Sequence, residues 1–252
     1  MEEKKMSEEK KTVRAAERAL DILLCFVSQP HLGLTEIAKQ TQLNKSTVFR
    51  LLATLESKGF IKRDPETDKY QLGFRIWELA ANIDQSHDPA ILFLPEMESL
   101  RDELEETVSL YIRDGNERIR VQAVESKQAI RRVAPIGARM PLAVGASSKV
   151  LMAYTDPKVL EQVIQDPMWP MGVNKEVYQA QLKQIREEGY AISVEEREAG
   201  TAAVAVPIFN RRKQLIAALA VSGPVSRMSV QQMMQFVPNL VKAAEQMSKK
   251  IS

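Results

Sequence analysis

The chain has 252 residues, 44% of them hydrophobic and 27% charged, which is typical of a soluble protein long enough for two domains with separate cores. Its formal net charge of +2 excludes a general polycation, so any affinity for nucleic acid must come from a local basic patch. The single cysteine, Cys25, excludes an intramolecular disulfide framework, and no segment approaches the ~20 apolar residues of a membrane span. We therefore expect a cytoplasmic protein, and we interpret the charged residues 1–12, which lack the apolar core of a signal peptide, as a disordered tail.

The first predicted helix covers residues 13–27. One stripe of it is apolar with helical spacing and the opposite side is charged, so we expect the stripe to face a core. Cys25 lies in the last turn, and we interpret it as a small packing residue rather than a reactive thiol. The apolar stripe consists of Ala16, Leu20, Leu23 and Val27.

A helix-turn-helix unit followed by a β-hairpin is predicted next. Residues 34–41 and 45–58 read as two helices joined by a tight connection. Extended runs at 60–63 and 69–72 flank the turn-forming sequence Asp-Pro-Glu-Thr-Asp, which predicts a hairpin directly after the second of these helices. The combination predicts a winged helix, and we assign residues 13–73 to this domain.

A further helix begins at Phe74 and is interrupted by the sequence Ser-His-Asp-Pro, so we assign residues 74–88 to a linker helix and residues 89–252 to a second domain. In the second domain helices are interleaved with strands, and two strongly apolar runs predict a buried hairpin of central strands. This pattern predicts an α+β fold with helices packed against one sheet. The expected helices are residues 90–106, 146–154, 156–165, 176–188 and 230–249, and the expected strands are residues 108–113, 119–126, 201–209 and 215–223.

The helix at 45–58 presents a short, polar and basic outer face. Between residues 37 and 63 there are six positive side chains and one negative, a local excess that supplies phosphate contacts. We expect Lys45 and the wing residue Lys62 to neutralise phosphates, and Arg50 to reach a guanine edge. The alternative is a solvated helix face on a protein-interaction module. The candidate residues for contact with double-stranded DNA are Lys45, Ser46, Thr47, Phe49, Arg50, Lys62 and Arg63.

The sequence resembles the IclR family of bacterial transcriptional regulators over most of its length, from about Val13 to Val225. The resemblance implies a winged helix, a linker helix that helps dimerisation and a GAF-like C-terminal domain that binds a small organic acid as effector. It also implies a homodimer, or a tetramer built as a dimer of dimers, on palindromic or repeated operators. The matching segments are RALDILLCF, LTEIAKQTQLNKSTVFRLLATLESKGFI, YQLGFRIWELA, PIGARMPLAVGASSKVLMA, GYAISVEEREAGTAAVAVPIF and AALAVSGP.

The effector pocket follows from the same resemblance, position by position. The family's glycine-alanine pair falls on Gly145 and Ala146, at a helix start whose backbone amides favour an anion. An acidic position of the family is Ser193 here. The full set of expected effector-binding residues is Met140, Leu142, Gly145, Ala146, Ser193, Ala203, Ala220 and Ser222.

Three of these positions depart from the pattern of relatives that bind small keto acids, because the family's acid, cysteine and first serine are here Ser193, Ala203 and Ala220. With fewer polar anchors the pocket is expected to suit a larger or more apolar ligand, such as an aromatic or sugar-derived acid. The alternative is that Gly145, Ala203 and Ala220 are simply close-packed small residues.

An enzyme or a metal protein is not expected. His31 and His87 fall in separate breaks, and with one cysteine they do not form a typical zinc set. Glu195, Glu196 and Glu198 have no basic or nucleophilic partner fixed nearby, so we interpret them as part of a solvated turn or strand end. The sequence has no phosphate-binding or nucleophile-elbow motif, and no cofactor is predicted. We therefore expect a DNA-binding repressor of a catabolic operon, and the alternative is an enzyme of small acids with an incidental basic helix.

Overall fold

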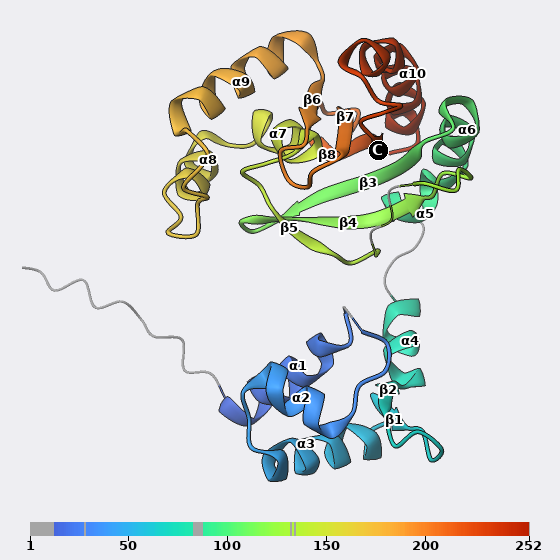
Figure 1. Ribbon diagram of the computed structural model, residues 1–252, viewed down its shortest axis with the longest axis vertical. Coiled ribbons are helices and arrows are strands. Elements are labelled where there is room, and N and C mark those ends of the chain that lie inside the picture. The colour runs from blue at the N-terminus through green and yellow to red at the C-terminus, as the bar shows by residue number, and fades with distance from the viewer. Residues whose placement is uncertain (1–12, 28, 83–87, 132, 134, 252) are drawn as a thin grey trace, which may run out of the picture. The chain divides into compact units, whose positions relative to one another are not determined.

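The computed structural model describes residues 13–251 except positions 28, 83–87, 132 and 134 (Figure 1). The chain divides into two compact units, residues 1–84 and residues 85–252, and each has its own hydrophobic core. The predicted tail at residues 1–12 and the segment around His87 lie outside the described residues. The predicted fold class, α+β with an N-terminal winged helix-turn-helix, is confirmed.

The first unit is built from helices packed around one small core, with a two-stranded hairpin at its edge. Gln42 adopts a left-handed conformation with φ of 56°, which ends α2 and turns the chain into α3. Asp64 fixes the hairpin turn, because its carboxylate accepts hydrogen bonds from the amides of Glu66 and Thr67. The elements are α1 (Arg14–Cys25), α2 (Leu34–Thr41), α3 (Lys45–Ser57), β1 (Ile61–Arg63), β2 (Tyr70–Leu72) and α4 (Phe74–Ala81).

The predicted core-facing stripe of α1 is correct only at Leu23, which packs against the core, whereas Ala16, Leu20 and Val27 are exposed. The buried side of this helix is formed by Ile22, Cys25 and Phe26, which pack on α2 and α3, whereas Leu20 is 59% exposed. The helix carries two apolar stripes, both with helical spacing, and periodicity alone does not say which one faces the core. The outward stripe includes Val13, Leu20, Leu24 and Val27, and all four side chains are exposed.

The start of α4 is held by a close approach between two glycines. A Cβ atom at Gly73 would lie 2.2 Å from the carbonyl oxygen of Gly59, so only glycine fits there. The amide of Gly73 donates to the carbonyl of Phe60, and the amide of Arg75 donates to the carbonyl of Gly59. The hairpin and α4 are thereby tied to the C-terminal end of α3.

The second unit is organised around one antiparallel sheet of six strands in the order β5-β4-β3-β8-β7-β6. Its central strands are the two apolar runs that the sequence predicts as a buried hairpin. The strands are β3 (Thr107–Asp114), β4 (Glu117–Val124), β5 (Arg139–Pro141), β6 (Ala191–Val194), β7 (Thr201–Phe209) and β8 (Leu215–Pro224). The helices are α5 (Pro89–Leu92), α6 (Leu94–Leu104), α7 (Ala146–Ala153), α8 (Pro157–Ile164), α9 (Lys175–Glu188) and α10 (Val230–Lys249).

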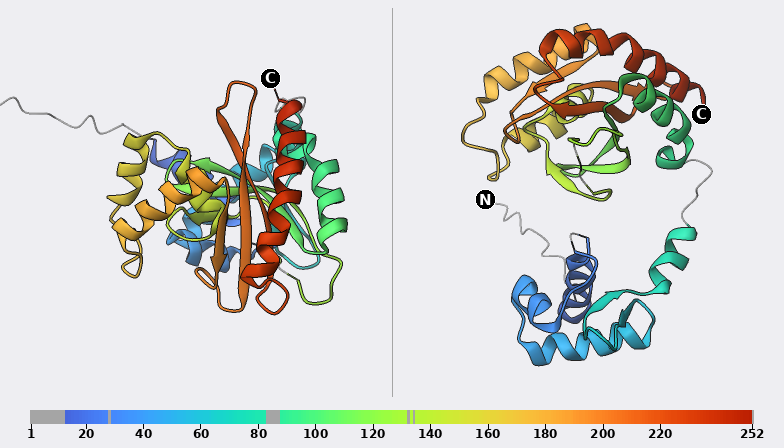
Figure 2. Two further views of the ribbon diagram at one scale, coloured as in Figure 1. Left: turned by 90° about the horizontal axis from the view of Figure 1, so that it is seen from above. Right: turned by 45° about the vertical axis from the view of Figure 1, so that its right-hand side comes forward.

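Helices cover both faces of the sheet, with α6 and α10 on one face and α7, α8 and α9 on the other (Figure 2). The side chains of β8 alternate between the two faces. Leu219 and Val221 join the larger core under α10, whereas Ala218 and Ala220 face α7. Small residues on the α7 face let this helix approach the sheet closely.

The single helix predicted at residues 90–106 is wrong, because α5 and α6 are separated by a turn at Phe93. Pro95 lacks an amide hydrogen and its ring disfavours a continuous helix across this point, so a new helix starts instead. The edge strands β5 and β6 are not predicted from the sequence either. Each has only three or four residues, too few to show the two-residue alternation that identifies a strand.

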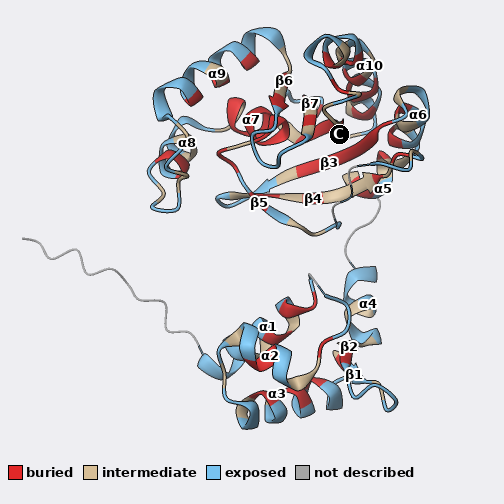
Figure 3. Ribbon diagram, in the orientation of Figure 1, coloured by how far each residue is buried: buried red, intermediate tan, exposed pale blue. Residues whose placement is uncertain are grey.

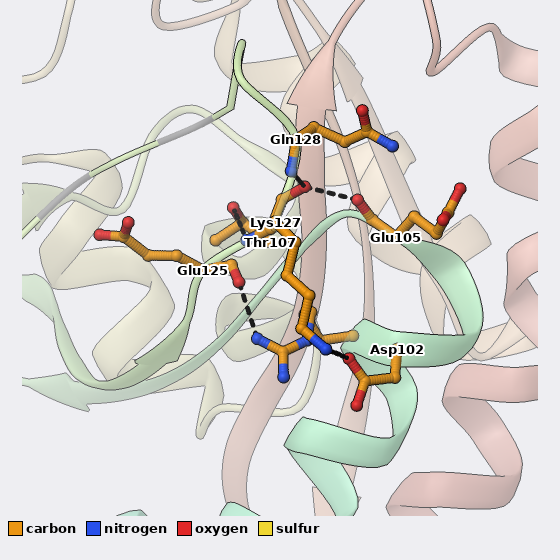
Figure 4. Close-up of polar contacts among 8 residues, drawn as sticks. Asp102, Glu105, Thr107, Glu125, Lys127 and Gln128 are labelled. Atoms are coloured by element: carbon orange, nitrogen blue, oxygen red, sulfur yellow. Dashed lines mark hydrogen bonds and ion pairs between the residues drawn. The ribbon is translucent and has the colours of Figure 1, made fainter.

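The turn that follows β4 is fastened to α6 and β3 by polar contacts (Figure 4). The hydroxyl of Ser126 donates to the carbonyl of Glu105, and the amide of Ser126 donates to Oγ1 of Thr107 at 3.1 Å. Lys127 and Asp102 form an ion pair at 2.7 Å on the surface. These contacts satisfy the polar groups at the C-terminal end of α6 and fix where β4 ends.

Candidate functional site

The outer face of α3 is free for contact with a partner. Lys45, Ser46 and Arg50 are exposed, Phe49 is 51% exposed, and Thr47 is half-buried. The opposite face packs into the core of the first unit through residues 48, 52 and 55. The helix is thus rigidly placed, and its outer face carries mostly short side chains that allow close approach of another surface.

The wing adds two more exposed cations beside α3. Lys62 and Arg63 both lie on β1, and Arg63 is paired with Asp68 at 2.5 Å while its guanidinium lies 5.6 Å from the ring centroid of Tyr70. Glu56 accepts a hydrogen bond from the amide of Arg63, which joins the wing to α3. A helix of this size fits the DNA major groove, and the cations on either side of it are suited to phosphate contacts.

A small cavity of about 60 Å³ lies in the second unit, between the sheet and the start of α7. Its sheet side is formed where three neighbouring strands meet. Ser193 of β6 is the partner of Ala203 of β7, and Ala203 is the partner of Ser222 of β8, so the three side chains form a row across one face. Ala220 lines the same face.

The helix side of the cavity is closed by an ion pair between a buried lysine and a partly exposed glutamate. Lys149 of α7 contacts Glu196, and the other carboxylate oxygen of Glu196 accepts a hydrogen bond of 3.0 Å from the amide of Gly145. Gly145 has φ of +94°, which glycine adopts freely. The helix-start amide that the sequence marks as an anion site is therefore already used by an internal carboxylate.

Two buried arginines of β4 line up on the remaining side of the cavity region, around one tyrosine. The guanidinium carbons of Arg118 and Arg120 lie 5.0 and 5.5 Å from the ring centroid of Tyr111. Arg120 donates two hydrogen bonds to the Tyr111 hydroxyl, at 3.1 and 2.9 Å, and Arg118 donates one to the hydroxyl of Ser147.

Burial and the neighbouring charges shift the pKa values of the groups in this cluster. Burial lowers the pKa of Arg118 to about 10, so its guanidinium is still a cation at neutral pH. Burial by itself raises the pKa of Tyr111, but the positive charges of Arg120 and Arg118 outweigh that effect, and the net shift is downward. The cluster is therefore a buried centre of positive charge.

Comparison with known proteins identifies the two units. The first matches the IclR helix-turn-helix domain over residues 15–65, and the second matches the bacterial transcriptional regulator IclR C-terminal domain over residues 83–249. The chain belongs to the IclR family of bacterial transcriptional regulators. As a member of the IclR family, it is a transcriptional regulator with a DNA-binding helix-turn-helix and a C-terminal effector domain.

Relatives extend the match to nearly the whole chain. XynR of Escherichia coli is 32% identical over 243 residues, which cover 94% of this chain and 96% of the relative. KdgR of the same organism is 29% identical, with coverage of 94% and 92%. A solved IclR homologue from Microbacterium hydrocarbonoxydans, complexed with 4-hydroxybenzoate, is 25% identical and superposes with a TM-score of 0.83 over 94% of this chain and 98% of its own. XynR and KdgR are named as transcriptional regulators, so this IclR-family chain is a regulator rather than an enzyme.

The cavity of this IclR-family chain contains six of the eight residues expected in the effector pocket: Gly145, Ala146, Ser193, Ala203, Ala220 and Ser222. The other two are buried beside it without lining it. The sulfur of Met140 contacts a guanidinium nitrogen of Arg197, and the carbonyl of Leu142 accepts a hydrogen bond from the hydroxyl of Tyr178 at 2.7 Å.

One interpretation of this region from the sequence is wrong. Glu196 has a basic partner, Lys149, and lines the cavity, although the turn that carries it is exposed as expected. Arg118 and other polar side chains that sequence reasoning missed also surround the cavity. The signal was present in the strand pattern Arg118-Ile119-Arg120, in which the arginines are buried and the isoleucine is half-exposed. The missed lining residues are Tyr111, Arg118, Ser147, Glu196, Arg197, Thr201 and Ala202.

The described part of the chain contains no group of three or more histidine, cysteine, aspartate or glutamate side chains placed to hold a metal ion. Over the same residues, no helix has both the length and the hydropathy to cross a bilayer. Burial raises the pKa of the Cys25 thiol, which makes it less reactive as a nucleophile, and this thiol donates to the carbonyl of Asp21.

Proposed function

We propose that this regulator binds a palindromic or repeated operator through α3 and the wing, and that a small organic acid in the C-terminal cavity changes its affinity for that operator. We further propose that it acts in the cytoplasm as a repressor of a catabolic operon. The observation that carries the proposal is the short-chained basic face of α3 on a helix-turn-helix of the IclR type. Figure 3 shows that α3 has exposed residues along its length.

Base reading and phosphate contact are divided among the exposed residues. Arg50 lies on the outer face of α3, where a forked guanidinium can bind a guanine edge, and Phe49 can contact a thymine methyl. Lys45 and Lys62 supply point charges for phosphates, and the hydroxyls of residues 46 and 47 donate to phosphate oxygens. Arg63 joins the phosphate contacts only by leaving Asp68.

A second copy of the chain is the proposed partner of two exposed apolar surfaces of the first unit. One includes Leu20 and Leu24 of α1, which are 59% and 63% exposed, and the other includes Trp77 of α4, which is 63% exposed and stacked on Phe74. Exposed apolar stripes of this size on helices are typical of helix–helix interfaces. A two-fold dimer would present two copies of α3 to neighbouring half-sites of a palindrome.

The effector proposal rests on the cavity and its positive charge. Arg118 and Arg197 line it, which favours an anion. The homologue from Microbacterium hydrocarbonoxydans is complexed with an organic acid, 4-hydroxybenzoate, which supports the same class of ligand for this chain. The C-terminal unit is thus proposed to be a GAF-like effector domain that also takes part in oligomerisation.

The proposed switch acts on the spacing of two winged helices within the dimer. An effector can change operator affinity only if it binds the DNA-competent and the incompetent states with different affinities. We propose that the linker at residues 74–83 transmits this difference from the residues around Gly145 and Ser222. An acid that binds the protein but leaves operator affinity unchanged would contradict this mechanism.

The test is capture of fragmented genomic DNA from the source organism by the full-length protein, followed by sequencing. The proposal predicts enrichment of one palindromic or repeated sequence, and binding that weakens steeply as salt rises, because phosphate contacts release counterions. Addition of organic acids should then change the amount of that fragment retained. Recovery of no preferred sequence, with or without acids, would refute the proposed operator binding.

A further inference from the structure

The cavity has an unbalanced charge. Among its lining residues, Arg118 and Arg197 are cations and Glu196 is the carboxylate. Both oxygens of that carboxylate are engaged, one with Lys149 and the other with the amide of Gly145. Glu196 is therefore not available as the counter-charge of Arg118.

Arg118 is the cation of the cavity that this imbalance leaves without a carboxylate counter-charge. It is 5% exposed, and no carboxylate among the described residues lies within ion-pair distance of it. One nitrogen donates to Ser147, but Nε has no acceptor in the described part of the protein. A buried cation without a partner is costly, and such groups are normally paired or satisfied by a ligand.

A second unpartnered polar atom lines the same cavity. The hydroxyl of Ser222 on β8 is buried and has no hydrogen-bond partner among the described residues. The two groups come from separate parts of the sheet, β4 and β8, and each needs an acceptor that a molecule bound in the cavity can supply. A carboxylate fits this role, because it accepts hydrogen bonds from a guanidinium edge and from a hydroxyl.

We propose that Arg118 is the receptor for the acid group of the effector, with Nε and Nη2 binding a carboxylate side by side. The inference rests on the proposed function, in which this cavity holds an organic acid. It differs from the expectation raised by the sequence, because a side chain of β4 and not the start of α7 supplies the anion contact. The glycine at 145 is part of the arrangement, since a Cβ there would lie 3.0 Å from Nη2 of Arg118.

The size of the cavity narrows the ligand class. One water needs about 10–15 Å³ of a cavity measured in this way, so about 60 Å³ has room for roughly four to six non-hydrogen atoms, as in an acid of two or three carbon atoms. This size favours a compact acid over an aromatic one.

The experiment is calorimetric titration of the full-length protein with four probes: acetate, its uncharged analogue acetamide, pyruvate and 4-hydroxybenzoate. Each is also titrated into Arg118→Gln, which keeps a polar side chain but removes the charge. The matched control is Arg113→Gln, which removes an exposed arginine of β3 outside the cavity. Melting temperatures of the unliganded variants and their binding to the captured operator fragment are measured in parallel.

We expect acetate or pyruvate to bind the wild type and Arg113→Gln with equal affinity. Binding to Arg118→Gln should be about 10- to 100-fold weaker, because the charge-assisted hydrogen bonds to the carboxylate are lost. Acetamide should bind much more weakly than acetate. Unliganded Arg118→Gln should melt at the same temperature as the wild type or higher, because the substitution removes an unpaired buried charge. A merely structural arginine predicts a lower melting temperature and unchanged acid binding.

Three results would overturn the inference: no compact acid binds the wild type, Arg118→Gln binds acids as well as the wild type does, or 4-hydroxybenzoate binds more tightly than acetate and pyruvate. Because operator binding is measured on the same samples, these outcomes are distinct from failure of the proposed regulator function. A protein that binds its operator but no compact acid would remain a regulator with a different ligand.

Discussion

Replacing Glu196 by glutamine should destabilise the C-terminal unit, because Lys149 then becomes a buried cation without a counter-charge. The Lys149 side chain is 7% exposed and that of Glu196 is 28% exposed. Glutamine still accepts the hydrogen bond from the amide of Gly145, so the main loss is the ion pair itself. Removing one partner of a buried pair costs about 3–5 kcal/mol, and partial access of water to residue 196 reduces the expected loss to about 2–3 kcal/mol.

Urea unfolding followed by tryptophan fluorescence measures this loss of stability in the C-terminal unit of the protein. The chain has two tryptophans, and Trp169 lies in the C-terminal unit, where its indole donates to the carbonyl of Val173. A Trp77→Phe background leaves Trp169 as the only reporter. With a slope of about 2 kcal/mol per molar urea, the midpoint of Glu196→Gln should fall by about 1–1.5 M.

Two further variants test whether the buried charge of Lys149 causes the loss of stability. Glu187→Gln changes an exposed glutamate of α9 and should shift the midpoint by less than about 0.3 M. The double variant Glu196→Gln with Lys149→Met removes both charges and should recover most of the lost stability. A wild-type midpoint for Glu196→Gln, or a double variant no more stable than the single one, would show that the buried charge does not determine the effect.

Two further predictions concern the dimer and the charged cluster. Leu20→Lys combined with Leu24→Lys should convert the protein to a monomer in sedimentation. Arg18→Glu, an exposed change on another side of α1, should leave the dimer intact. A monomeric wild type would contradict the proposed interface. Arg118→Gln should raise the pKa of Tyr111, which two arginines hold below its usual value, as followed by ultraviolet difference absorbance during alkaline titration. Because the folded pKa is lowered, this tyrosine adds stability only as the pH rises through that pKa and adds none at neutral pH, and an unchanged titration would refute the assigned cause.

The helix-turn-helix could be predicted from the sequence because its signals are local. The observed bounds of α2 and α10, Leu34–Thr41 and Val230–Lys249, coincide with the predicted ones, and α3 differs by one residue. Periodicity, the short connection and the turn residues of the wing act within a few residues of one another. The same locality explains the error in α1, where two apolar stripes have equal periodicity and only the packing of α2 and α3 decides which one is buried.

The cavity could be predicted only in part, because its chemistry depends on residues far apart in the chain. A buried arginine contradicts the usual preference of this residue for solvent, and nothing near residue 118 shows that Tyr111 of β3 and Ser147 of α7 will surround it. Pairing of Glu196 with Lys149 likewise joins residues 47 positions apart. The resemblance to a family located six lining residues, but it did not indicate which side chain carries the charge.

We propose above that the outer face of α3 contacts DNA bases. The most direct test measures the affinity of the wild type, Arg50→Ala and Lys45→Ala for the captured operator and all its single-base variants. We predict that Arg50→Ala costs about 1–3 kcal/mol of binding free energy and loses discrimination at one symmetric pair of operator positions. Lys45→Ala should weaken binding uniformly across all the sequences and reduce the salt dependence. If Arg50→Ala also weakened every sequence equally, while preference at each position stayed as in the wild type, Arg50 would not contact a base and the claim would be contradicted.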